Sequence, residues 1–335
     1  RSDGRRAWAC SSDGRPTAVR PARGDSSDAG PLFSFGLVAD VQYADRENGM
    51  SKSTGNVKQY RATPGLLGEA VGKWLQRADT LDFVLNLGDT IDGNETDEGA
   101  LHDLEVVAEV FDRLGNIKAH HVLGNHCLAA PRDMLLQRLG MPHAYYTADI
   151  APGWRLVTLD TTEMSNNSRY PQCSYQHVES IEFAQTHPPN LYPYMTSYNG
   201  GISSVQMRWL RSQLQSARAN SERVVIACHH PVGQGSCRPT HMAWNCVDIQ
   251  EAIVSSGVVP LVLSGHDHPG GYARNQDTHF VTLHGMLEAP SGSTAFAVVN
   301  VFPDAIEFEG YGVVPCRKLG IPKVADWSAS AARVQ

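Results

Sequence analysis

From residue 32 onward, short runs of apolar residues alternate with longer stretches in which apolar residues recur every three or four positions. The short runs predict buried strands, and the longer stretches predict amphipathic helices. The predicted strands are Phe33–Ala39, Phe83–Leu87, His120–Leu123, Leu156–Leu159, Val224–Ala227 and Leu261–Leu263. The predicted helices are Pro64–Ala78, Glu98–Leu114, Ser203–Ala217 and Val247–Ser256. This alternation is typical of a layered α/β protein in which helices pack over a sheet.

Three parts of the chain depart from this rhythm. Residues 1–30 are rich in Arg, Ser, Asp, Gly and Pro without apolar periodicity, which predicts a disordered tail. Residues 161–200 hold five tyrosines together with Asn, Pro and His, and we interpret them as an inserted loop or lid near a binding site. Residues 294–312 alternate like an antiparallel pair of strands. We therefore expect one large domain over residues 31–316, followed by a C-terminal tail over 317–335.

Polar residues recur at the points where the predicted strands end. The motifs in question are Asp40-Val41-Gln42, Gly88-Asp89, Gly124-Asn125-His126, His229-His230-Pro231 and Gly265-His266-Asp267-His268. In open α/β sheets the ligand crevice lies outside the carboxyl ends of the strands. We therefore expect these side chains to meet at one edge of the sheet.

The side chains in these motifs form a set of candidate metal ligands. They are Asp40, Gln42, Asp89, Asn125, His229, His266 and His268. Nitrogen and oxygen donors without thiolates suit Mn, Fe, Zn or Co better than Mg or Ca. Seven ligands are too many for one ion but suit two, which can lower the pKa of a shared water and hold both ends of an in-line displacement. Each motif alone has a structural explanation, such as a turn or a helix cap, but their occurrence in order after five strands favours a metal site.

Composition and charge narrow the class of protein. The 335 residues carry 28 basic and 35 acidic side chains, a net charge of −7, which gives no basic field for nucleic acid. No apolar run is long enough to predict a membrane span. The seven cysteines contain no CxxC pair, which indicates reduced thiols in an intracellular protein. We expect a cytoplasmic protein, or an organellar one if residues 1–30 are the remnant of a transit peptide, and a monomer is compatible with the sequence.

The order of the motifs resembles that of the calcineurin-like metallophosphoesterases, over about residues 33–315. Gln42 stands where most members have a histidine. This glutamine, together with the runs 199–201 and 265–272, is similar to one subfamily, the manganese-dependent ADP-ribose/CDP-alcohol diphosphatases. The resemblance implies a layered β-sandwich flanked by α-helices, with a dinuclear metal site at the C-terminal ends of the strands.

The resemblance also implies how the ligands divide between two metal ions, with Mn²⁺ preferred. One ion would be bound by Asp40, Gln42 and His268. The other would be bound by Asn125, His229 and His266, with Asp89 bridging the two.

Further residues are implied to act on the substrate. His126 would face the scissile phosphate or the leaving group, as the catalytic residue. The implied substrate contacts are Tyr43, Arg169, Asn199 and Trp244, and Trp244 and the tyrosines of the insertion would stack on a base. The family has an acidic residue after Gly-Asn-His, whereas this chain has Cys127. A carboxylate that would orient His126 is therefore missing from that position.

The implied activity is hydrolysis of the diphosphate bond in ADP-ribose and in CDP-alcohols such as CDP-choline and CDP-glycerol. The products would be a nucleoside monophosphate and a phosphorylated sugar or alcohol. Two alternatives stay open: a phosphomonoesterase or cyclic-nucleotide phosphodiesterase on the same scaffold, and a protein-binding scaffold with an inactive site. The sequence does not rank ADP-ribose, the CDP-alcohols and cyclic ADP-ribose as substrates.

Overall fold

The computed structural model describes residues 9–10, 16–17 and 30–322, and the chain divides into two compact units after Pro31. In the first unit, β1 (Ala9–Cys10) and β2 (Pro16–Thr17) pair in antiparallel fashion. Of the predicted disordered tail over residues 1–30, the structure describes these four residues and Gly30, and the rest lies outside the described residues. The remaining elements all belong to the second unit.

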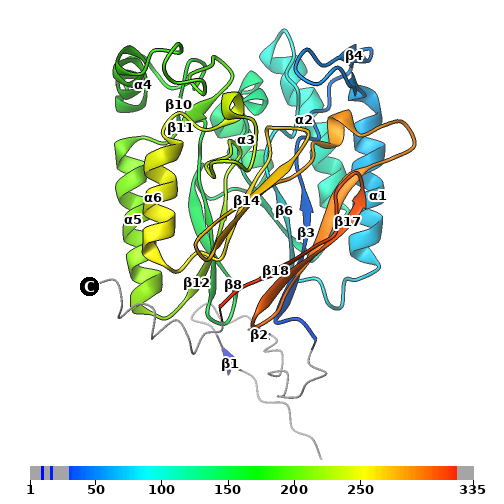
Figure 1. Ribbon diagram of the computed structural model, residues 1–335. Helices are drawn as coiled ribbons and strands as arrows, with labels where there is room; N and C mark the ends of the chain where they lie inside the picture. Colours follow the sequence, from blue (N-terminus) through cyan, green and yellow to red (C-terminus); the bar gives the residue numbers. More distant parts are fainter. Residues whose placement is uncertain (1–8, 11–15, 18–29, 323–335) are drawn as a thin grey trace, which may run out of the picture. The chain divides into compact units, whose positions relative to one another are not determined.

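The second unit contains two six-stranded sheets (Figure 1). The first has the order β18 (Arg317–Gly320), β17 (Ala305–Gly312), β16 (Ala295–Val301), β3 (Phe33–Val38), β6 (Phe83–Asn86) and β7 (Lys118–His121). The second has the order β14 (Gly271–Asn275), β15 (Thr278–Thr282), β13 (Leu261–Ser264), β12 (Arg223–Ala227), β9 (Trp154–Thr158) and β8 (Tyr146–Ala151). Strands β3, β6 and β7 are parallel, and so are β9, β12, β13 and β15. Each sheet thus has a parallel part whose carboxyl ends can carry ligands.

The two sheets pack face to face over one apolar core. This core joins Phe35 and Leu37 of β3 to Leu156 of β9 and Val225 of β12. The ring of Phe33 meets the ring of Trp154 edge to face, with centroids 5.2 Å apart. Aromatic pairs of this geometry add to the free energy gained by burying apolar surface. The arrangement confirms the predicted layered sandwich.

Helices cover the outer faces of both sheets. Beside the first sheet lie α1 (Thr63–Leu75) and α2 (Asp97–Asp112), and beside the second lie α5 (Ser204–Ala219) and α6 (Cys246–Ser256) (Figure 1). The Ser203 hydroxyl accepts a hydrogen bond from the main-chain N–H of Gln206 and so caps the start of α5. Trp74 of α1 packs so tightly against β3 that a Cβ at Gly36 would lie 2.6 Å from its ring. No helix in the described part of the chain combines the length and apolar character needed to cross a membrane.

Residues 161–200 are more ordered than the predicted irregular loop. They contain β10 (Met164–Ser165) and α4 (Tyr175–Thr186), and β10 pairs with β11 (Gly200–Gly201). Arg132 of α3 (Arg132–Arg138) ties this insertion to the sandwich: its Nη1 lies 2.7 Å from the buried Asp160 Oδ2, and its Nε donates to the main-chain oxygen of Ser168. These two charge-assisted contacts tie the insertion to α3.

Two points in the sequence-based interpretation need correction, the start of the C-terminal tail and the number of sheets. Strand β18 pairs with β17, so the sheet continues past residue 316, where the C-terminal tail was predicted to begin; residues 323–335 lie outside the described part. The strands form two sheets, as the family resemblance implied, rather than the single sheet expected from the apolar pattern alone, because an apolar run does not reveal which partner it will pair with. Short 3₁₀ helices complete the structure, at Tyr60–Ala62, His126–Ala129, Pro239–His241 and Met286–Glu288.

Candidate metal centre

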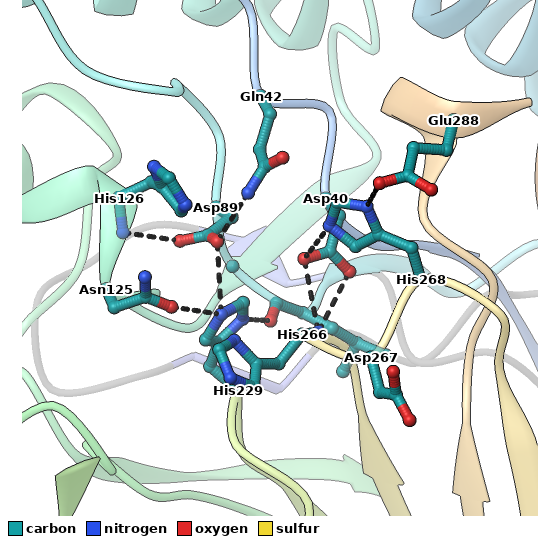
Figure 2. A network of polar contacts seen from close by, with 12 residues as sticks. Asp40, Gln42, Asp89, Asn125, His126, His229, His266, Asp267, His268 and Glu288 are labelled. Carbon is teal, nitrogen blue, oxygen red and sulfur yellow. Dashed lines mark hydrogen bonds and ion pairs between the residues drawn. The ribbon is translucent and has the colours of Figure 1, made fainter. Parts of the chain in front are cut away.

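The seven predicted ligands lie together, although they come from both sheets (Figure 2). Asp40, Asp89 and Asn125 follow β3, β6 and β7 of the first sheet. His229 and His266 follow β12 and β13 of the second sheet. The expectation of a single sheet edge was therefore wrong, because the site forms where the carboxyl ends of two facing sheets meet.

Direct contacts link the predicted ligands. Gln42 Nε2 donates to Asp89 Oδ2 over 2.8 Å, and His229 Nε2 lies 3.2 Å from the same oxygen. His229 Nε2 is also 3.1 Å from Asn125 Oδ1. On the other side of the cluster, the main-chain N–H of His266 donates to the Asp40 carboxylate, and His268 Nε2 lies 3.5 Å from Asp40 Oδ1. Asp89 therefore stands at the centre of the group.

The main chain is strained at several of these positions. Asp40, Gln42, Asp89 and His266 have positive φ angles, of 53°, 45°, 49° and 69°. Positive φ is uncommon outside glycine, and each such residue costs about 1–3 kcal/mol, which the surrounding contacts must offset. Strain of this kind clusters at functional sites because it aims side chains that ordinary strand geometry would turn away.

Each predicted ligand histidine has one ring nitrogen held by a residue outside the predicted ligand set. His229 Nδ1 lies 2.9 Å from the main-chain oxygen of Leu87, which can only accept, so this nitrogen carries the proton. His268 Nδ1 lies 2.9 Å from Glu288 Oε1, and His266 Nε2 lies 2.8 Å from Asn199 Oδ1. Holding one nitrogen in this way fixes the ring and leaves the other available as a metal donor.

The pKa values of the histidines at the two ends of the cluster are shifted in opposite directions. Burial disfavours a charge on His268, but the Asp40 and Glu288 carboxylates outweigh it and raise the pKa of His268 to about 10. Burial likewise opposes ionisation of Glu288, yet the His268 ring lowers the pKa of Glu288 to about 2. At the other end, burial and the neighbouring histidines lower the pKa of His266 well below its usual range. His266 is therefore a neutral imidazole, the form that binds metals.

The residues present fit divalent metal ions. The carboxylates of Asp40 and Asp89 and a ring nitrogen of His229 lie within 4.8 Å of one another. The buried Oε1 of Gln42 has no hydrogen-bond partner among residues 30–322. A buried amide oxygen left without a partner costs about 1–3 kcal/mol, and a bound cation would remove that cost. His230 also lies close, but Thr161 Oγ1 and the main-chain oxygen of Tyr198 bind its two nitrogens, so we exclude it from the ligands.

His126 lies beside the cluster and is oriented by Asp92. Its Nδ1 is 2.7 Å from the main-chain oxygen of Asp92 and 3.5 Å from the Asp92 carboxylate, which leaves Nε2 free. Cys127 is buried, and burial raises the pKa of its thiol to about 11, so it is an uncharged core residue. His126 is therefore oriented by a main-chain oxygen, while the Asp92 carboxylate pairs with Arg46.

Two adjoining pockets meet at Asn125 and His126. One, of about 350 Å³, opens over the cluster, and its wall includes Lys52, Lys58, Tyr60, Tyr198, Arg238 and His241. The other, of about 680 Å³, has a mixed-charge wall that includes Asp45, Arg46, Asp92, Glu95 and Arg169. Within residues 30–322 the two lysines of the first pocket have no carboxylate partner, whereas Arg46 and Arg169 of the second pair with Asp92 and Asp97.

The predicted substrate contacts are only partly found in these pockets. Arg169 lines the larger pocket, but it also forms an ion pair with Asp97. Tyr43 pairs through its main chain with Ile91, and its ring packs against the core. Trp244 is 2% exposed and lies among buried residues of the insertion, so its predicted stacking on a base is wrong.

Sequence reasoning missed several residues that surround the cluster. Glu288 and Asp92 act on ligand or catalytic histidines from distant positions, and no spacing rule links them to those histidines. Lys52 and Lys58 belong to the hairpin formed by β4 (Gly49–Met50) and β5 (Val57–Lys58), a polar segment without apolar periodicity. The positive φ angle of Gln42 could not be predicted either, because glutamine has no preference for this conformation.

Comparison with known proteins agrees with the geometry. The family model for calcineurin-like phosphoesterases matches residues 33–270. A manganese-dependent ADP-ribose/CDP-alcohol diphosphatase from Arabidopsis thaliana is 33% identical, over 84% of this chain and 94% of the relative. The protein of the same name from Mus musculus is 33% identical, over 86% of this chain and 93% of the relative.

A solved structure shares the fold. The crystal structure of a dimetal phosphatase from Danio rerio superposes with a TM-score of 0.80 and 31% sequence identity, over 87% of this chain and all of that one. The family match over residues 33–270 includes all seven predicted ligands. The chain is thus a hydrolase of phosphate bonds, and it belongs to the calcineurin-like phosphoesterase family.

Proposed function

We propose that this protein hydrolyses the diphosphate bond of ADP-ribose and of CDP-alcohols, with two Mn²⁺ ions as cofactors. The observation that supports this most is the cluster of seven nitrogen and oxygen donor residues, five of them buried, at the meeting point of the two sheets. The names of relatives that match most of the chain support the substrate and the metal. The products would be a nucleoside monophosphate and a phosphorylated sugar or alcohol.

We assign the ligands to two sets that share one carboxylate. Asp40, Gln42 and His268 form one set, and Asn125, His229 and His266 form the other. Asp89 bridges them, an assignment supported by its contact with one member of each set, at 2.8 Å to Gln42 Nε2 and 3.2 Å to His229 Nε2. When bound, the two ions would neutralise phosphate oxygens and lower the pKa of a water that attacks phosphorus.

His126 acts on the leaving group. Its Nδ1–H is held by the main-chain oxygen of Asp92, so the ring presents Nε2 to the pocket. Desolvation lowers the pKa of His126, the Asp89 carboxylate opposes this, and the positive charge of Lys58 adds to the lowering. The departing group is itself a phosphate with a pKa near 6, so it needs little protonation. With Nδ1–H held by Asp92, Nε2 can donate to the departing oxygen only when the ring is an imidazolium, the form that the Asp89 carboxylate favours.

The walls of the smaller pocket bind the rest of a diphosphate substrate. Lys52 and Lys58 have no carboxylate partner within residues 30–322, so their charges are available to a second phosphate. Tyr198 is 40% exposed in the same pocket, whereas Trp244 is buried. Tyr198 therefore replaces Trp244 as the residue that would stack on a base.

The test is release of AMP from ADP-ribose by metal-stripped protein, with Mn²⁺ or Mg²⁺ added back separately. Strong turnover with Mn²⁺ and little with Mg²⁺ is the expected result. AMP and cyclic AMP, assayed in parallel, separate the diphosphatase from a phosphomonoesterase or a cyclic-nucleotide phosphodiesterase. Absence of AMP release in protein that binds Mn²⁺ would overturn the ADP-ribose assignment.

A further inference from the structure

Asn199 was expected to contact substrate, but its side chain lies behind a predicted metal ligand. It is 1% exposed and stands just before β11, at the end of the insertion. Its Nδ2 donates to the main-chain oxygens of Tyr194 and Thr240, over 2.8 and 2.9 Å. Its Oδ1 lies 2.8 Å from His266 Nε2. One buried amide thus joins the insertion, the loop after β12 and the cluster.

These contacts fix the orientation of the amide. Main-chain oxygens can only accept hydrogen bonds, so the group that faces Tyr194 and Thr240 must be the NH₂ of Asn199. The opposite orientation would place an amide oxygen against two carbonyl oxygens in a buried site. Since Oδ1 can only accept, the nitrogen of His266 that faces it must carry the proton.

We infer that Asn199 is a positioning residue whose Oδ1 accepts a hydrogen bond from Nε2–H of His266, which holds the proton on Nε2 and so makes Nδ1 of His266 the nitrogen that binds the metal ion. The inference rests on the proposed assignment of His266 as a ligand. A neutral imidazole has one N–H and one lone pair, so fixing the proton on Nε2 fixes the donor on the other nitrogen.

The surroundings hold Asn199 in place. A Cβ on the next residue, Gly200, would lie 2.5 Å from the main-chain oxygen of Thr161 and 2.7 Å from that of Met164. Only glycine therefore fits there, and the main chain that carries Asn199 packs directly on the start of the insertion. The other two ligand histidines are held by Leu87 and Glu288, which lie outside the insertion. The His266 set alone thus depends on the insertion.

The first experiment measures Mn²⁺ binding to metal-free protein by electron paramagnetic resonance of the free ion. Asn199→Leu keeps the volume of the side chain but removes both hydrogen-bonding groups. We expect one of the two Mn²⁺ sites to weaken by about 10- to 100-fold, the usual effect of losing such a partner, while the other keeps its affinity. Two sites of unchanged affinity would overturn the inference.

The matched control is Asn245→Leu. The Asn245 amide is also a bridge within this region, because it bonds the N–H and the oxygen of Ile202 over 3.2 and 2.7 Å. The Asn245→Leu substitution should leave both Mn²⁺ affinities unchanged if the effect of Asn199→Leu acts through His266. Equal weakening by the two substitutions would show a general loosening of the insertion and would overturn the inference.

A second measurement needs no variant. Nitrogen NMR of the wild-type, metal-free protein with ¹⁵N-labelled histidine reports which ring nitrogen of His266 carries the proton. We expect Nε2, and a proton on Nδ1 would overturn the inference even if the Asn199 variant failed to fold. Because neither readout uses ADP-ribose, failure of the proposed substrate would leave this test intact.

Discussion

The metal cluster and the walls of the pocket above it are built in different ways. Five of the seven predicted ligands are buried, and most ligands directly follow strands of the sandwich core. The pocket walls come instead from the β4–β5 hairpin and the insertion, where Met50 is 65% exposed and Tyr198 is 40% exposed. The predicted metal ligands thus depend on the core, and we propose that the hairpin and the insertion surround the rest of the substrate.

The sharpest test of the cluster is Asp89→Asn. The substitution removes one negative charge and turns an NH₂ group toward either Gln42 Nε2 or the N–H of His126, which both donate to Asp89 now. We expect Mn²⁺-dependent kcat/KM for ADP-ribose to fall by more than about 100-fold, beyond the usual cost of losing an outer-shell partner of a ligand. Asp133→Asn, at an exposed position on α3, is the matched control. Intact Mn²⁺-dependent turnover in the Asp89 variant would refute the bridging role.

Trp244→Ala separates burial from substrate contact. Trp244 is 2% exposed and packs with Met164 and Met195, so its loss should lower the free energy of unfolding by about 3–5 kcal/mol. The KM for ADP-ribose of the folded fraction should stay unchanged. Tyr198→Ala should do the reverse, raising KM with little effect on unfolding measured by urea denaturation. A raised KM in the Trp244 variant would restore it as a substrate contact.

This contrast also explains what could be predicted from the sequence. Buried strands read clearly as apolar runs, and the polar residues after them were identifiable because the chain must turn there. Asp40, Asp89 and His266 were found in this way. The assignment of strands to two sheets came from the family resemblance and not from the apolar pattern, since pairing depends on contacts between distant residues.

The residues around the cluster left weaker signals. Glu288 reaches His268 across 20 positions of sequence, and Lys58 reaches the pocket from a hairpin of two-residue strands. The sequence could not show whether Trp244 contacts the substrate, because an aromatic residue near a binding loop can either pack in the core or stack on a base. Only the three-dimensional packing decided between them.

Acid provides a test of the core that does not touch the pocket. His120 of β7 is 4% exposed, packs edge-on against Phe83, and burial lowers its pKa to about 4. The unfolded chain takes up this proton near pH 6.5, before the folded chain does. The stability present above pH 6.5 is therefore lost as the pH falls toward 4, by about 3 kcal/mol. His120→Phe should flatten this decline in urea denaturation. His143→Phe, at an exposed position, should not, and an equal slope in both variants would contradict the assignment.

Lys58→Met tests whether the hairpin contributes to selection of a diphosphate. Lys58 lines the smaller pocket and lies close enough to influence His126, yet it follows no strand of the sandwich. Losing one charge-assisted hydrogen bond to the second phosphate should raise the KM for ADP-ribose roughly 10-fold. It should also reduce the sensitivity of KM to salt, because one screened charge is gone.

Hydrolysis of bis(p-nitrophenyl) phosphate, which has no second phosphate, should change little in the Lys58 variant. Lys73→Met, on the exposed side of α1, controls for the loss of a positive charge. If the KM values of both substrates rose equally, Lys58 would act on the scissile phosphate. The proposal that the hairpin binds only the rest of the substrate would then be wrong for this residue.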